Sequence, residues 1–342
     1  MSLARVFGHV IDKVIEAPVV TSFTNIGYQV RSRLPDWSDL DEVGLGGRTV
    51  VVTGGTSGLG LATAEGLAKL GAQVVITGRK RKRADSVAAQ INQSLTALTS
   101  AGVGEVSGAG ADMGELDDVR ALADELLTKH PTIDVLVHNA GALAAERREN
   151  SAGIEATVAS QVFGPFLLTS LLLERLGMER TGSARSQKPG RVLTMSSGGM
   201  YSSGLTVSNL EMSAQEYGGT GQYARAKRAQ VTLNEMWADR ESSADVVFHA
   251  MHPGWADTPG VEESLPMFRK IVGPLLRTPE QGADTMVWLA ADDEPANCTG
   301  GFWLDRTRRS IHKSPMTKRT DTTERRRELW NRCVEVTGAV IP

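Results

Sequence analysis

The chain has 342 residues, of which 41% are hydrophobic and 23% charged, a composition that excludes intrinsic disorder over most of its length. The formal net charge of −3 argues against a nucleic-acid partner, because proteins that bind nucleic acid are usually basic. Two cysteines, Cys298 and Cys333, are too few for a disulfide framework, so we expect a cytoplasmic protein. No run of apolar residues approaches the ~18 that a membrane-spanning helix needs.

Residues 1–42 are predicted to form an amphipathic helix followed by a polar linker. Leu3, Phe7, Val10 and Val14 share one helical stripe, and Pro18 ends the pattern. This stripe favours packing on the rest of the protein or on a second subunit. A peripheral membrane contact is the weaker alternative, because the polar face of the helix carries both signs of charge.

Residues 43–305 are predicted to be a single α/β domain, because short β-branched runs alternate there with longer helical patterns. The runs lie at 49–53, 73–77, 135–139, 191–195, 246–250 and 301–305. The helical patterns lie around 58–70, 82–98, 115–129, 152–177, 221–241 and 279–291. Continuous apolar strands separated by helices predict a doubly wound parallel sheet of the Rossmann-like type.

A glycine-rich turn follows the first predicted strand. The segment T-V-V-V-T-G-G-T-S-G-L-G covers 49–60 and places Gly54, Gly58 and Gly60 between a strand and a helix. Glycines in this position permit a tight turn and a close approach of phosphates, and the helix N-terminus offers free N–H groups to them. The turn therefore predicts a dinucleotide site.

Five further motifs come in order along the chain after the glycine-rich turn. They are Asp112-Met113, His138-Asn139-Ala140-Gly141, Ser196-Ser197, Tyr223-x-x-x-Lys227 and Pro253-Gly254-x-x-x-Thr258. Together with the turn spacing T-G-x-x-x-G-x-G, they resemble the short-chain dehydrogenase/reductase family, classical type, over about 50–260. The resemblance implies a nicotinamide dinucleotide and a set of residues that hold it. These are Gly54, Thr56, Ser57, Gly58, Leu59, Gly60, Arg79, Lys80, Asp112, Met113, Asn139, Ala140, Gly141, Tyr223, Lys227, Pro253, Gly254 and Thr258.

The resemblance also implies catalytic roles for Ser197, Tyr223 and Lys227. Tyr223 and Lys227 are four residues apart and so are neighbours on one helical face. A free phenol has a pKa near ~10, and a nearby ammonium group lowers it toward the range of a general acid/base. Ser197 would hold the substrate oxygen beside Tyr223 while hydride passes between the cofactor and the substrate carbon.

Two positions depart from the family pattern. Gln161 stands where the family carries an Asn that helps to hold a water in the proton relay from the lysine. Replacement of the asparagine by glutamine has a mild effect if the relay uses the backbone carbonyl of this residue. It lowers turnover if the relay uses the side chain. His138 replaces the first Asn of N-N-A-G, and we interpret it as a contact at the end of a strand.

The end of the second strand favours NADP(H) over NAD(H). An enzyme that uses NAD carries an acid about 20 residues past the glycines. Here Arg79 lies 19 residues past Gly60, and Arg79-Lys80-Arg81-Lys82-Arg83 is entirely basic. Arg79 is predicted to bind the 2′-phosphate with help from Lys80 or Arg83, and Ser57 is a further candidate. Arg81 and Lys82 are interpreted as a solvated helix start.

Residues 259–278 are predicted to form a substrate lid, and residues 306–342 a basic C-terminal tail with a helix. The apolar content of the lid favours an apolar carbonyl or alcohol as substrate. Trp255 is expected to add to this apolar surface, and Leu205 and Met200 are further candidates. Packing of the lid on the core is the alternative explanation. The tail carries nine basic and four acidic residues over 305–328 and is interpreted as solvated; an anionic substrate, an acidic partner or a membrane surface are alternatives.

We therefore predict an oxidoreductase that interconverts a carbonyl and an alcohol with NADP(H), and that forms a homo-oligomer. One alternative is a cofactor-binding but catalytically weak redox sensor or scaffold. Another is an epimerase or dehydratase on a related fold, which the glycine spacing disfavours. The histidines are not paired beside cysteines or acids, so no metal is predicted.

Overall fold

The computed structural model describes residues 3–16, 18–40, 43–98, 102–176 and 188–341. At its centre lies an eight-stranded sheet with the order β3-β2-β1-β4-β5-β6-β7-β8, in which the short β8 pairs antiparallel to β7 and the other pairs are parallel. The strands are β1 Thr49–Val52, β2 Gln73–Gly78, β3 Val106–Gly110, β4 Val135–His138, β5 Gly190–Met195, β6 Val246–Met251, β7 Gly301–Leu304 and β8 Thr307–Arg308.

The strand order reverses between β1 and β4, as in a doubly wound Rossmann-like fold, which confirms the predicted fold class. Strand β1 is buried on both faces because its valines alternate between two helical layers. Val50 and Val52 pack on one side of the sheet, and Val51 packs on the other. In such sheets ligands bind at the carboxyl ends of the strands, beside the point where the order reverses.

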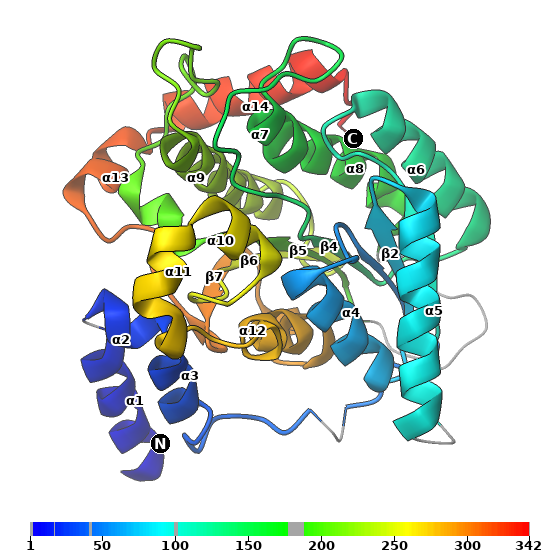
Figure 1. Cartoon of the computed structure of the whole chain (residues 1–342), viewed down its shortest axis with the longest axis vertical. Helices are drawn as coiled ribbons and strands as arrows, with labels where there is room; N and C mark the ends of the chain where they lie inside the picture. Colours follow the sequence, from blue (N-terminus) through cyan, green and yellow to red (C-terminus); the bar gives the residue numbers. More distant parts are fainter. Residues whose placement is uncertain (1–2, 17, 41–42, 99–101, 177–187, 342) are drawn as a thin grey trace.

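Two layers of helices cover the sheet (Figure 1). One layer holds α4 Gly58–Lys69, α5 Arg81–Leu98 and α12 Pro279–Ala291. The other holds α6 Leu116–Lys129, α8 Gly164–Leu172, α9 Gly219–Ala238 and α14 Thr323–Thr337. The remaining elements are α1 Leu3–Glu16, α2 Val19–Phe23, α3 Asn25–Arg31, α7 Ala156–Val158, a π-helix η1 Ala159–Phe163, α10 Pro259–Ser264, α11 Pro266–Val272, α13 Pro315–Thr320, and short 3₁₀ segments η2 Leu173–Arg175, η3 Gly198–Ser202, η4 Gly273–Leu275 and η5 Pro295–Asn297.

The helical run Ala156–Arg175 is long and apolar enough to cross a membrane by length and composition. However, 72% of its most apolar window is buried inside the protein. Val162, Phe166 and Leu168 belong to the hydrophobic core beside α6 and α9. The run is therefore a core helix of the α/β domain.

Strand β3 is the one parallel strand that the predicted runs omit. Its sequence, V-S-G-A-G, holds a single β-branched residue and two glycines, which is a weak signal for a strand. A Cβ on Gly108 would lie 2.5 Å from the backbone nitrogen of Asp85, so only glycine lets α5 pack this closely. Pairing with β2 and close packing under α5 therefore create a strand that local propensity does not encode.

The first helix does not bury the side that its sequence predicts. Val10 and Val14 are 53% and 68% exposed, whereas Asp12 is only 5% exposed. Asp12 receives charged hydrogen bonds from Arg31 at 2.7 Å and from Arg309 at 2.5 Å. The prediction that the apolar stripe packs on the rest of this chain is wrong at these two valines, because ion pairs orient the helix. The side chains of Leu3 and Phe7, the other members of the stripe, lie outside the part that the structure describes.

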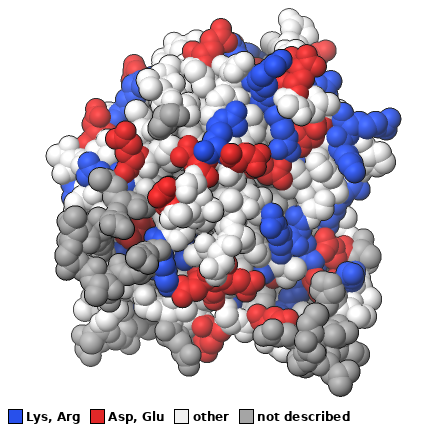
Figure 2. Space-filling view, turned by 180° about the vertical axis from the view of Figure 1, so that it is seen from behind, with Lys and Arg blue, Asp and Glu red and all other residues white. Residues whose placement is uncertain are grey.

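The C-terminal segment is also less solvated than predicted. The side chains of Arg306 and Arg309 are 7% and 5% exposed, and Arg306 forms a bidentate pair with Asp284. Trp330 and Cys333 of α14 belong to the core. On the face shown in Figure 2, basic and acidic side chains are interspersed, as expected where arginines are paired with acids. The interpretation of the whole basic tail as solvated is therefore wrong.

Candidate active site

The glycine-rich turn between β1 and α4 packs directly against the loop after β4. Gly54 and Gly58 have φ angles of 67° and 54°, in the left-handed region that favours glycine. A Cβ on Gly54 would lie 2.8 Å from Cα of Ala140, and one on Gly60 would lie 2.3 Å from the Gly54 carbonyl oxygen. Ser57 precedes α4 without capping it by a side-chain hydrogen bond. The turn therefore has the tight, uncapped form that suits phosphates.

Asn139 joins the two loops. Its Nδ2 donates to the carbonyl oxygens of Thr53 and Gly54 at 3.0 and 3.1 Å. Thr53 Oγ1 accepts from the backbone nitrogens of Asn139 and Ala140. The predicted site omits Thr53, although its place immediately before Gly54 marks the same turn. Asn139 thus acts in the fold as a brace beneath the turn.

The other predicted cofactor residues lie around this brace. A Cβ on Gly78 would touch Thr56 at 2.7 Å, which places Thr56 at the end of β2. Leu59 and Pro253 both adjoin Gly282 of α12, and Gly58 faces Thr258, which caps α10.

On the β3 side, Asp112 accepts a hydrogen bond from Gly114 N at 2.9 Å, and the carbonyl of Met113 packs against Gly164. Gly254 has a φ of 74°, and Gly141 packs on Gln161. The structure therefore gathers loops from four of the six motifs at one edge of the sheet.

Ser197, Tyr223 and Lys227 lie at the same edge. A Cβ placed on Gly199 would lie 3.4 Å from Ser197 Oγ and 3.9 Å from two ring carbons of Tyr223, so both side chains adjoin Gly199. Lys227 Nζ lies 5.3 Å from the Tyr223 ring centroid and donates to the Met195 carbonyl at 2.8 Å. Ser197 Oγ accepts from Gly199 N at 3.1 Å, which leaves its own hydrogen free to donate.

Burial shifts both titratable groups of this trio. Burial raises the pKa of Tyr223 above its usual value, and interaction with Ser197 offsets part of the rise. Burial lowers the pKa of Lys227 to about 7. The four-residue spacing predicts that Lys227 lowers the pKa of Tyr223. In this conformation desolvation dominates instead, because the ammonium group is directed at a carbonyl of β5.

Gln161 lies in the π-helix and is fully buried. Its Nε2 donates to the Ala142 carbonyl at 2.8 Å, whereas its Oε1 has no hydrogen-bond partner in the described part of the chain. His138 contacts Thr169 Oγ1 through Nε2 at 2.7 Å, as predicted for a contact at a strand end, and its Nδ1 is unpartnered among the described residues. Burial lowers the pKa of His138 to about 3. Both side chains line a small cavity of about 30 Å³, which is room for a water.

The basic residues after β2 are exposed. Neither the Arg79 nor the Lys80 side chain has a hydrogen bond or ion pair within the described residues, so both are available to a ligand. Arg81 differs, because it pairs with Glu125 and donates to the Gly108 carbonyl at 3.2 Å. Among the residues that the structure describes, no group of three or more His, Cys, Asp and Glu is arranged to hold a metal.

Helices α10 and α11 form the predicted lid segment. Ser264 Oγ donates to the Leu143 carbonyl at 2.9 Å, and Phe268 packs edge-on against Trp255 with ring centroids 5.1 Å apart. Met200 and Leu205 are fully buried in core clusters. They are therefore not part of an exposed substrate wall, and that expectation is wrong.

Residues 48–267 match the family model described as short chain dehydrogenase. The chain belongs to the short-chain dehydrogenase family. It is 36% identical over 293 residues to "Dehydrogenase/reductase SDR family member 12" of Bos taurus, covering 85% of this chain and 86% of that protein. It is 32% identical to "Retinol dehydrogenase 14" of Homo sapiens over 273 residues, covering 76% of this chain and 78% of that protein.

The fold is also similar to that of a solved, uncharacterized protein from Mycobacterium paratuberculosis, with a TM-score of 0.66 and 23% identity. That match covers 89% of this chain and 99% of the other. The family consists of oxidoreductases that bind NAD(P)(H), and the uncapped glycine turn braced by Asn139 fits such a dinucleotide.

Proposed function

We propose that the protein interconverts a carbonyl and an alcohol on an apolar small molecule with NADP(H), and that Tyr223 is the general acid/base. The observation that carries the proposal is the meeting of Ser197 and Tyr223 beside Gly199, with Lys227 one helical turn away. These groups share the sheet edge with the glycine-rich turn. A substrate oxygen held there lies next to the dinucleotide-binding loops.

Each group of the trio has a distinct task in this proposal. The Ser197 hydroxyl donates to the substrate oxygen, since its own oxygen already accepts from Gly199 N. Tyr223 gives its phenolic proton to that oxygen in reduction and takes it back in oxidation. The bound nicotinamide supplies the hydride chemistry. Lys227, in its protonated form, favours the phenolate of Tyr223.

Gln161 is proposed to act on the loop after β4 rather than through a water of the proton relay. Its side-chain amide nitrogen holds the Ala142 carbonyl, and its side chain lines the small cavity beside His138. A shorter asparagine side chain would not span the same gap. Gln161 therefore holds the Gly141–Ala142 turn in place, where it adjoins the catalytic edge.

The preference for NADP(H) rests on Arg79 and Lys80. Both are exposed immediately after β2, and neither side chain is paired with a residue of the described chain. An arginine fork matches a phosphate in a bidentate manner, whereas an NAD enzyme carries a carboxylate there. We therefore assign the 2′-phosphate to Arg79, with Lys80 assisting.

The proposal of an apolar substrate is based on the aromatic residues of the lid and its neighbouring loop. Phe268 and Trp255 bring aromatic surface from α11 to the loop after β6. The relative named retinol dehydrogenase carries the name of an apolar alcohol, which is the same class of substrate. Together these features favour long-chain or cyclic carbonyls over sugars.

The first test is a fluorescence titration of the purified protein with NADPH and, separately, with NADH. We expect tighter binding of NADPH; equal or tighter binding of NADH would overturn the phosphate assignment. Turnover is then measured with NADPH and decanal or all-trans-retinal. A protein that binds NADPH but turns over neither aldehyde supports the redox sensor or scaffold instead.

A further inference from the structure

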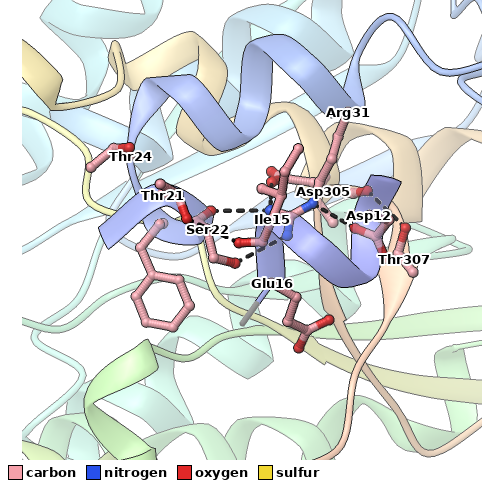
Figure 3. Close-up of polar contacts among 12 residues, drawn as sticks. Asp12, Ile15, Glu16, Thr21, Ser22, Thr24, Arg31, Asp305 and Thr307 are labelled. Atoms are coloured by element: carbon pink, nitrogen blue, oxygen red, sulfur yellow. Dashed lines mark hydrogen bonds and ion pairs between the residues drawn. The ribbon is translucent and has the colours of Figure 1, made fainter. Parts of the chain in front are cut away.

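The three N-terminal helices are tied to the main domain by buried charges (Figure 3). Arg31, at the end of α3, donates to Asp12 at 2.7 Å and to Asp305 at 2.8 Å. Arg277 donates to the same Asp305 carboxylate at 2.5 and 2.9 Å and to the Ser22 carbonyl at 3.0 Å. The side chains of Arg31, Arg277 and Asp305 are each 1% exposed. This charge cluster fixes α2 and α3 beside the end of β7.

The charge cluster leaves Phe23 at a defined place. Its carbonyl oxygen accepts from Trp255 N at 2.7 Å and from Arg277 Nε at 3.1 Å. Its ring is 4% exposed and lies 4.3 Å from the His252 ring and 5.9 Å from the Trp255 ring, centroid to centroid. The side chain is therefore inserted into the loop that follows β6.

The same ring touches the loop that carries Ser197. A Cβ on Gly198 would lie 2.6 Å from Cε2 of Phe23, so the ring packs directly on the backbone of Gly198. Gly198 immediately follows Ser197 and begins η3, and Ser197 Oγ caps that segment by accepting from Gly199 N. A shift of the Gly198 backbone would therefore move the Ser197 hydroxyl relative to Tyr223.

We propose that Phe23 is a positioning residue, through which the N-terminal extension fixes the Ser197 hydroxyl by packing on Gly198. This inference rests on the proposed function, because it assigns Ser197 to the substrate oxygen. Phe23 acts through Ser197 and does not itself touch the reacting atoms. Its contact with Trp255, which packs on Phe268 of α11, links the same ring to the lid.

The first experiment is a double-mutant cycle with Ser197. Phe23→Ala is expected to lower kcat for the reduction of decanal with NADPH by about 10- to 100-fold, the usual cost of misplacing a catalytic group. The dissociation constant of NADPH is expected to change far less than kcat, because the ring packs on Gly198, His252 and Trp255, none of which is assigned to the cofactor. In the Ser197→Ala background, Phe23→Ala has little further effect, since the residue that it positions is gone. An equal loss in both backgrounds overturns the proposal.

Two further variants control the experiment. Phe23→Leu keeps an apolar side chain against Gly198 and is expected to restore most of kcat, which also provides a folded variant if the alanine variant does not fold. Val20 lies on the same helix and is 51% exposed, so the variant Val20→Ala is expected to behave like the wild type. A loss of kcat in Val20→Ala as large as that in Phe23→Ala would show a general effect of the extension and overturn the proposal.

Hydrogen exchange tests the positioning without any turnover. The Gly199 amide donates to Ser197 Oγ, so its protection reports the position of that hydroxyl directly. We expect the Gly199 amide to exchange faster in Phe23→Leu than in the wild type, and faster still in Phe23→Ala. The exchange rates of the β5 amides should remain as in the wild type. Unchanged exchange at Gly199 overturns the proposal, whatever the activity. If the wild type reduces neither aldehyde, the proposed function fails, and the exchange of Gly199 still decides the role of Phe23.

Discussion

The buried carboxylate of Asp305 offers a direct test of what holds the N-terminal extension in place. Asp305 receives three charged hydrogen bonds, two from Arg277 and one from Arg31. Burial alone would raise the pKa of this carboxyl group, but the two guanidinium groups hold it below its usual value. The perturbation is Asp305→Asn. Since φ at this position is 50°, and asparagine tolerates that conformation well, the backbone is not further strained.

The expected loss of stability is large. The neutral amide would leave the buried guanidinium of Arg277 without its carboxylate partner, and within the described residues Arg31 would keep Asp12 as its only carboxylate partner. Breaking a buried ion pair in this way costs about 3–5 kcal/mol. The entropy of unfolding of 342 residues is about 0.7 kcal/mol/K, at ~2.1 cal/mol/K per residue. The melting temperature should therefore fall by about 4–7 °C.

The assay is thermal unfolding followed by circular dichroism, together with limited proteolysis of the extension. Asp293→Asn is the matched control, since Asp293 is 67% exposed and pairs with Lys188 at the surface. Such a pair contributes at most about 1 kcal/mol, which corresponds to about 1 °C. Equal melting temperatures for Asp305→Asn and Asp293→Asn would refute the argument that the buried cluster holds the extension.

Three other predictions concern the site and the buried histidines. Arg79→Asp should reverse the preference for NADPH over NADH in the fluorescence titration, because it replaces a phosphate ligand by a carboxylate; an unchanged preference would move the phosphate site elsewhere. Tyr223→Phe should lower kcat by about 10²- to 10⁴-fold and leave NADPH binding intact, as expected for loss of a general acid/base, and a variant with wild-type turnover would rule out that role. Burial lowers the pKa of His249 to about 4, so the folded state binds fewer protons than the unfolded state below pH ~6.5. Stability should thus fall by up to about 2 kcal/mol for this histidine between pH ~6.5 and ~5, and a melting temperature that is constant over this range would contradict it.

The sequence by itself determines the elements whose signal is local. Runs such as T-V-V-V-T are strands because their apolar residues are continuous, and Gly54 and Gly58 mark a turn because they take positive φ angles. The four-residue spacing of Tyr223 and Lys227 places both on one side of α9, and the structure brings them beside Ser197. The order of these motifs along the chain is sufficient to predict the fold class and the edge of the sheet that carries the site.

The tertiary structure alone decides what depends on a distant partner. Helix α1 turns Asp12 inward because Arg309, 297 residues away, pairs with it. Strand β3 forms because β2 and α5 accept its small residues. Phe23 reaches Gly198 only because buried charges fix the extension at Asp305. An apolar stripe or a high β-propensity is a property of one segment. Which of its side chains are buried depends on the free energy of packing that segment against others that lie far away in the sequence.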